Sequence, residues 1–229
     1  IDPHGVAYLS VPADDTIIRL NLFDRTAKEL VKGRLGAPSD LAVVNNADGD
    51  MLAVADQFAL RTVEMNSGAI TDWLRVHAAD IRRPSGLGVG MKYVLLANPA
   101  AGSVTVVDRV KQQPLAQLGG FSMPLDALET EDGKFAILDS SVGELSLASA
   151  PDGAERRTIV HGLKIPVAMA SDEPQGLRVA PGRKLDDLTR RCVIESPLNA
   201  VRIDTTQILD HTPSPRSRHE CGAPGRAVA

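Results

Sequence analysis

Two aspartates with matching surroundings are the residues whose type and spacing first indicate chemistry. Asp40 and Asp126 each occupy the third position of a segment that opens with a proline, Pro38 in one case and Pro124 in the other. Hard divalent cations are bound by several oxygen ligands, and carboxylates at equivalent positions could supply two of them. Aspartates at such positions also cap turns by accepting hydrogen bonds from backbone N–H groups. No clear third carboxylate completes a cation site, so both interpretations stay open.

The other reactive residue types form no recognised constellation. Cys192 and Cys221 are not part of a CxxC pair, which argues against a zinc or dithiol motif and leaves a disulfide, a reactive thiol or no role at all. The histidines lack metal-binding spacing, and the sequence contains no GxSxG elbow and no Walker loop. The glycine-rich stretch 86–90 is not a GxGxxG motif, so we expect its glycines to permit close strand packing.

Both aspartates belong to an internal repeat of about forty residues. Units begin at Pro38, Pro84, Pro124 and Pro166, at spacings of 46, 40 and 42 residues. In the first three, an apolar proline segment is followed by a turn, a second apolar strand, a strand of alternating polarity, and a more polar fourth strand, whereas Pro166 only begins a further unit. Residues 6–32 supply three strands of an earlier unit. The second strands end in Asp56, Asn98 and Asp139, side chains that we expect to form turns.

Four short strands per unit of this length are typical of a β-propeller blade. Helical repeats would need segments of period 3.6, and residues 1–175 show none. The sequence therefore predicts an all-β propeller with about four visible blades. The proline segment would be the innermost strand of each blade, and the polar fourth strand its exposed edge. Trp73 lies on a fourth strand, and we expect it in the core between blades.

The unit that begins at Pro38 resembles an NHL repeat. The matching residues are Pro38–Val43, Asp48-Gly49, Leu52–Asp56, Arg61–Val63 and Asn66–Gly68. The units at 84–108 and 124–148 match less closely, because neither has the arginine and Asn98 replaces the aspartate in the first. The resemblance covers about residues 1–175 and implies a propeller of the SMP-30 and NHL type, which has six blades.

Blade counting leaves two arrangements open. The chain is either part of a six-bladed propeller, a fragment in that sense, or a closed four-bladed ring. In the closed ring, strand 166–170 would pair with the three N-terminal strands and remove two exposed sheet edges.

The resemblance implies functions of two different classes. One is a non-catalytic scaffold that binds a protein or carbohydrate partner through its loops and channel mouth, which the lack of a catalytic constellation favours. The other is a metal-dependent lactonase or related hydrolase, because SMP-30-like enzymes hold a divalent cation at the channel mouth through Glu, Asn and Asp. Asp40 and Asp126 would then be the carboxylates, facing one another across the channel. No other cofactor is expected.

Composition divides the chain near Gly176. We assign residues 1–176 to the blades, 177–203 to an irregular end piece, and 204–229, which lacks periodicity, to a disordered tail. The net charge of −4 argues against nucleic-acid binding, and no apolar run is long enough to span a membrane. The chain as given shows no signal peptide. We expect a monomer, and family resemblance alone indicates an extracytoplasmic location.

Overall fold

The structure is a computed structural model that describes residues 5–46, 49–74, 81–172, 176–181 and 201–203. In these residues the regular elements are β-strands and two short 3-10 turns, Pro12–Asp14 and Pro99–Ala101. The strands form five antiparallel sheets. The fold is therefore an all-β propeller, as the repeat predicted. Within the described part of the chain, no helix is long and apolar enough to cross a membrane.

Each sheet follows the chain from strand to neighbouring strand. The first contains β1 (Val6–Val11), β2 (Thr16–Asn21) and β3 (Ala27–Lys32). The second contains β4 (Asp40–Asn46), β5 (Gly49–Asp56), β6 (Ala59–Glu64) and β7 (Ile70–Leu74). The third contains β8 (Gly86–Val89), β9 (Tyr93–Asn98), β10 (Ser103–Asp108) and β11 (Gln113–Leu118). The fourth contains β12 (Pro124–Glu129), β13 (Phe135–Asp139), β14 (Glu144–Ala148) and β15 (Arg156–Val160). The fifth contains β16 (Pro166–Asp172), β17 (Gly176–Pro181) and β18 (Val201–Ile203).

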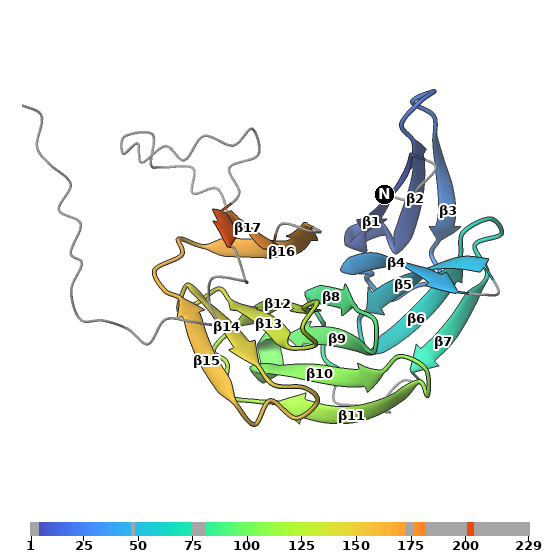
Figure 1. Cartoon of the computed structure of the whole chain (residues 1–229). Helices are drawn as coiled ribbons and strands as arrows, with labels where there is room; N and C mark the ends of the chain where they lie inside the picture. The colour runs from blue at the N-terminus through green and yellow to red at the C-terminus, as the bar shows by residue number, and fades with distance from the viewer. Residues whose placement is uncertain (1–4, 47–48, 75–80, 173–175, 182–200, 204–229) are drawn as a thin grey trace, which may run out of the picture.

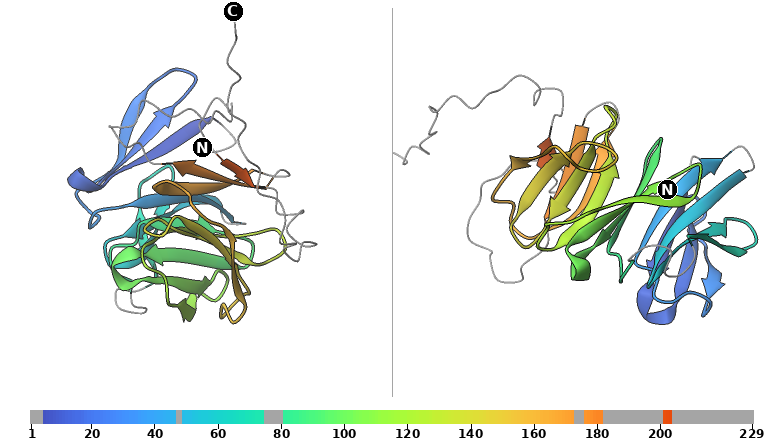
Figure 2. Two further views of the ribbon diagram at one scale, coloured as in Figure 1. Left: turned by 90° about the vertical axis from the view of Figure 1, so that its left-hand side faces the viewer. Right: turned by 90° about the horizontal axis from the view of Figure 1, so that it is seen from below.

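The sheets fan around a common centre. Figure 1 shows β8 and β12 towards the middle of the arc and the fourth strands β7, β11 and β15 at its outside. Strand β8 lies between β4 and β12, and β12 lies between β8 and β16. The two terminal sheets, β1–β3 and β16–β18, lie at opposite ends of this arc, as the views in Figure 2 also show. The proline segments are thus the innermost strands, as predicted.

The described strands do not form the closed four-bladed ring. That arrangement required strand 166–170 to pair with the N-terminal strands, whereas β16 pairs with β17, and β17 pairs with β18. The residues predicted as an irregular end piece thus include β18 and most of β17. Residues 182–200, with Cys192, and the predicted tail 204–229, with Cys221, lie outside the described part of the chain.

The core fills the spaces between neighbouring sheets. Between the second and third sheets, Leu60 and Trp73 pack with Leu87 and Leu96. Trp73 is 7% exposed, which confirms its predicted place in the core. The middle strands β9 and β13 are buried along almost their whole length, because sheets cover both of their faces. Burial of these aliphatic side chains is the main force that holds the blades together.

The glycine-rich strand β8 packs directly against the backbone of β12. A Cβ atom at Gly86 would collide with the carbonyl oxygen of Leu125, and one at Gly88 with that of Ala127. Only residues without a side chain allow this approach. The predicted role of the glycines in close strand packing is therefore confirmed.

Candidate functional site

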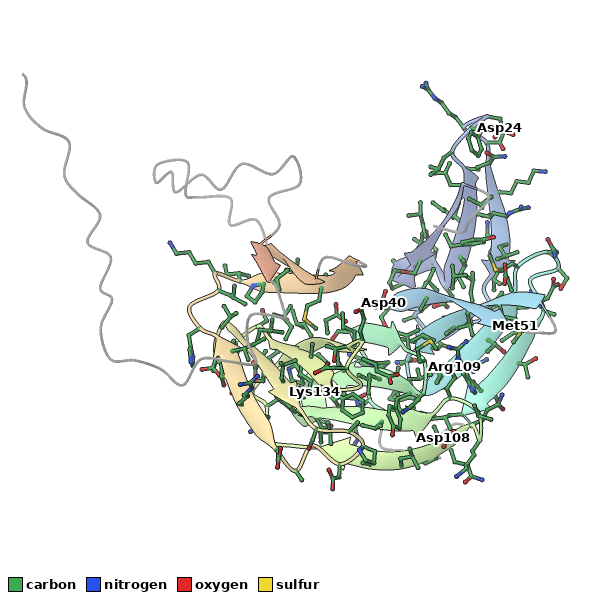
Figure 3. The ribbon with its side chains drawn as sticks, in the orientation of Figure 1. Asp24, Asp40, Met51, Asp108, Arg109 and Lys134 are labelled. Carbon is green, nitrogen blue, oxygen red and sulfur yellow. The ribbon has the colours of Figure 1, made fainter. Side chains whose placement is uncertain are left out.

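Asp40 joins two inner strands. Its Oδ1 accepts a hydrogen bond from the Leu41 backbone N–H on its own strand β4, at 2.8 Å. Its Oδ2 accepts one from the Leu87 backbone N–H on β8, also at 2.8 Å. The carboxylate therefore bridges the second and third blades at the beginning of their innermost strands. Figure 3 shows Asp40 towards the centre of the arc.

Asp126 makes the same arrangement between the fourth and fifth blades. Its Oδ1 accepts a hydrogen bond from the Ala127 N–H at 2.8 Å, and its Oδ2 accepts one from the Met169 N–H on β16 at 2.7 Å. Leu87 and Met169 hold the same position, the fourth of a proline segment. The two aspartates that the sequence singled out thus make the same bridge between successive blades.

Strand β8 contacts both aspartates. Asp40 accepts its hydrogen bond from Leu87, while a Cβ atom at Gly86 would lie 2.7 Å from the Asp126 Cα and 2.8 Å from its Oδ1. The two carboxylates were predicted to face one another across a channel. Strand β8 lies between β4 and β12, the strands that carry the two aspartates. Each carboxylate accepts hydrogen bonds from backbone N–H groups.

Burial changes the acidity of both groups. Burial raises the pKa of Asp40, although its two backbone hydrogen bonds oppose the change. For Asp126, burial is the largest cause and the negative charge of Asp40 adds to it, so the pKa rises to about 7 even though Met169 and Ala127 donate hydrogen bonds. The Coulombic effect indicates that the two carboxylates lie within reach of each other's field.

The cation site predicted at these aspartates stays a prediction. Among the described residues, no three His, Cys, Asp or Glu side chains are grouped so that they could hold a metal ion. Each of the four carboxylate oxygens already accepts one backbone N–H. His161 lies 3.1 Å from Glu144, measured from Nδ1 to Oε1, and His77 lies outside the described residues.

Serines at the second position of the proline segments form a further link that the sequence reasoning missed. Ser39 Oγ donates a hydrogen bond to the Pro84 carbonyl oxygen, and Ser85 Oγ donates one to the Leu125 carbonyl oxygen at 2.7 Å. From the first blade, Ser10 Oγ donates to the Ser39 carbonyl oxygen at 3.3 Å. The matching serines after Pro38 and Pro84 were the available signal.

Polar residues at the ends of the second strands hold the loops that enter each blade. Asp56 Oδ1 accepts a hydrogen bond from the Gly36 N–H at 2.8 Å. Asp139 accepts hydrogen bonds from the N–H groups of Ser122 and Met123, at 2.6 Å and 3.0 Å. Asn98 accepts a weaker one from Arg82 at 3.3 Å. These side chains were expected to order the following turn, and Asp139 does so by accepting a hydrogen bond from the Ser141 N–H at 3.3 Å, whereas the hydrogen bonds above come from the loop before the inner strand.

Backbone hydrogen bonds connect these loops to the turns beside them. The Arg83 N–H donates to the Gln57 carbonyl oxygen at 2.7 Å, and the Leu163 N–H donates to the Gly143 carbonyl oxygen at 2.9 Å. Both contacts join a loop entering one blade to a turn of the preceding blade. The loops at this end of the strands are therefore positioned by the scaffold rather than left free.

We call this surface the loop face. It comprises the loops that enter each blade and the turns between second and third strands, namely residues 12–15, 33–39, 57–58, 81–85, 99–102, 119–123, 140–143 and 161–165. Its exposed large apolar side chains are Phe58 (42% exposed), Met123 (37%), Val142 (50%) and Ile165 (41%). Met123 and Ile165 hold equivalent positions, each directly before a repeat proline.

Several residues at that pre-proline position have unusual backbone conformations. The φ angles of Ala37, Arg83 and Ile165 are 71°, 48° and 47°. Positive φ is rare for a side chain with a Cβ and most costly for a β-branched residue such as Ile165. Strained residues of this kind concentrate at functional sites. The repeat prolines were apparent from the sequence, which offered no direct signal for this strain.

Comparison with known proteins gives information on the fold. No protein-family model matches the sequence, and no curated protein matches it. Solved structures do match, 507 chains in all. A chain in the crystal structure of a nidogen/laminin complex has 12% identity and a TM-score of 0.64, over 78% of this chain and 68% of that one.

Enzymes are also among the similar structures. Virginiamycin B lyase from Staphylococcus aureus, solved with quinupristin, has 12% identity and a TM-score of 0.60, over 78% of this chain and 60% of the lyase. A streptogramin B lyase has 11% identity and a TM-score of 0.60, over 78% and 59%. This chain therefore spans about three fifths of the length of the two lyases. At these identities the comparisons support the β-propeller fold alone, and they do not distinguish the NHL type from others.

Proposed function

We propose that this chain is a non-catalytic propeller scaffold that binds a partner protein through its loop face. The observation behind the proposal is the exposure of Phe58, Met123, Val142 and Ile165 on loops and turns at one end of the blades. Contiguous exposed apolar side chains are typical of interaction sites, whereas isolated ones are ordinary. Backbone hydrogen bonds hold the loops in place, so binding would cost little ordering entropy.

The apolar character of the exposed large side chains on the loop face favours a protein over a carbohydrate. Carbohydrates present many hydroxyl groups, and these need polar partners when they are removed from water. The exposed large side chains of the loop face are instead hydrocarbon or thioether groups. The expected monomeric state, and the extracytoplasmic location that the resemblance implies, belong to the same proposal.

A metal-dependent hydrolase is the second candidate. The observation that favours it is the Asp126 carboxyl, whose pKa is raised to about 7 in a buried setting near the start of an inner strand. Against it, the oxygens of Asp40 and Asp126 accept backbone hydrogen bonds that a cation would have to replace or share. Calorimetric titration of calcium and zinc into the wild type and Asp40→Ala tests this candidate. Metal binding and lactone turnover that both fall in Asp40→Ala would establish the hydrolase.

Peptide selection tests the scaffold proposal. A random peptide library on phage would be panned on the full chain and counter-selected on the Val142→Ser/Ile165→Ser double variant. We expect peptides that bind the wild type and not the double variant. Val110→Ser is the matched control, because Val110 is 85% exposed on a turn at the opposite end of the strands. Peptides that bind all three proteins equally would contradict a role for the loop face.

A further inference from the structure

Basic groups outnumber acidic groups on the described loop face. The basic groups are Arg34, Arg82, Arg83, His161 and Lys164. The acidic groups are Asp14 and Asp15, both in the turn of the first blade. The excess of cations is local, because the whole chain has a net charge of −4.

The opposite ends of the strands show no such bias. The described turns there are residues 22–26, 65–69, 90–92, 109–112, 130–134 and 149–155. Their acidic residues are Asp24, Glu131, Asp132, Asp152 and Glu155, and their basic residues are Arg25, Lys92, Arg109, Lys111 and Lys134. Acids and bases are thus equal in number on that side, so the cations of the loop face are not a general property of turns in this chain.

The acids nearest to the loop face are already engaged. Asp56 and Asp139 are buried and accept hydrogen bonds from the entering loops. Glu144, at the start of β14, pairs with His161. The turn of the first blade adds Asp14 and Asp15, and the latter accepts a hydrogen bond from the Ala37 N–H. Most of the acids beside the loop face therefore already have partners within this chain.

Cations and apolar side chains lie close together on this surface. Arg83 donates its backbone N–H to Gln57, the residue before Phe58, and Arg83 is exposed. Lys164 is exposed and directly precedes Ile165. Arg83 and Ile165 also hold the equivalent pre-proline position in their blades. Phe58 and Ile165 are thus each accompanied by a positive charge.

We infer that the loop face recognises an acidic protein segment, whose apolar side chains contact Phe58, Met123, Val142 and Ile165 and whose carboxylates pair with Arg83 and Lys164. The inference rests on the proposed function and adds the chemistry of the partner. Complementary charges at the rim of an interface speed association and select the partner, while the apolar contacts supply most of the affinity.

The C-terminal segment of this chain does not have the required charge. Residues 176–229 contain eight arginines and Lys184 against six acidic residues, so their net charge is positive. The described loops of this face also offer Phe58 and Phe121 as their only aromatic side chains, few for the base stacking on which single-stranded nucleic acids rely. A separate acidic polypeptide fits the surface better than either.

The charge of selected peptides tests the inference. The phage library would be panned on the wild type and on Arg83→Glu/Lys164→Glu, with circular dichroism to confirm that both are folded. We expect wild-type peptides enriched in Asp and Glu beside apolar residues, with binding about tenfold weaker to the charge-reversal variant. Lys92→Glu/Lys111→Glu, on the opposite turns, should bind within about twofold of the wild type.

Other outcomes separate this inference from the proposed function. Peptides that lack an acidic excess, bind the charge-reversal variant equally well and are lost in Val142→Ser/Ile165→Ser would overturn the inference and leave the proposed function standing. A library that yields no peptide specific to the loop face would overturn both. Retention of random-sequence single-stranded RNA by the wild type, lost on charge reversal and without peptide enrichment, would also overturn the inference.

Discussion

The Asp126 carboxylate on β12 accepts a hydrogen bond from the backbone N–H of Met169 on β16, at 2.7 Å. Asp40 accepts the equivalent hydrogen bond from the Leu87 N–H, between the second and third blades. Between these two bridges Gly86 holds the position of the aspartate, and there β8 and β12 pack backbone against backbone. Successive inner strands are thus joined alternately by a carboxylate and by direct contact.

Removal of the Asp126 carboxylate should destabilise the fold. Asp126→Ala leaves the N–H groups of Ala127 and Met169 without their acceptor, at an expected cost of about 1–3 kcal/mol in the free energy of unfolding. Asp126→Asn keeps one acceptor oxygen and should cost less. Urea unfolding followed by circular dichroism measures both. Equal stability of Asp126→Ala and the wild type would show that the bridge contributes nothing.

The same carboxyl predicts how stability depends on pH. Its pKa is about 7 in the folded chain against an ordinary value of 3.8, so between these values the folded state binds more protons than the unfolded state. The free energy of unfolding should therefore fall as the pH rises from about 4 to about 7, and this contribution should level off above that range. The slope should be shallower in Asp126→Asn. Parallel curves for the two proteins would contradict the raised pKa.

A methyl group on β8 should force two blades apart. Gly88→Ala would bring a Cβ into the carbonyl oxygen of Ala127, and overpacking of this kind costs typically about 1–3 kcal/mol. Gly119→Ala is the control, since a Cβ there has no heavy atom within 4 Å and its φ is not in the left-handed region. Thermal unfolding of the two variants compares them directly. Similar melting temperatures would refute close packing of β8 on β12.

Replacement of Ile165 by glycine should raise the stability of the fold and weaken peptide binding. Its φ of 47° is strained for a β-branched residue, so Ile165→Gly should raise the free energy of unfolding by about 1 kcal/mol while weakening peptide binding. Val167→Gly, on the adjoining strand β16, has no such strain to relieve and should lower stability. Chemical unfolding and peptide-affinity measurements on both variants test these two effects. A loss of stability in Ile165→Gly would show that the conformation is not strained.

The repeat made most of the architecture predictable. The prolines at 38, 84, 124 and 166 set the register, and alternation in segments such as 103–108 gave the buried and exposed faces. The positions of β4 to β16 followed from these local patterns. Blade closure did not, because the pairing of β16 depends on which distant strand is close enough to bond, and local sequence carries little information on that.

The roles of the site residues were less accessible from the sequence. Asp40 and Asp126 were recognised from their shared position, but the sequence could not show that their partners are backbone N–H groups, which every residue except proline has. Arg83, Met123 and Ile165 differ in chemistry, so their common position before a proline was not apparent as a surface. Their proximity arises only when successive blades bring equivalent loops side by side.

The affinity of a peptide for the loop face decides whether this surface binds a partner. The affinity of one selected peptide would be measured by fluorescence anisotropy for the wild type, Val142→Ser/Ile165→Ser and the control Val110→Ser. A scaffold that binds through its loop face predicts a loss of about tenfold or more in the double variant and little change in the control. Equal affinity for all three proteins would contradict it.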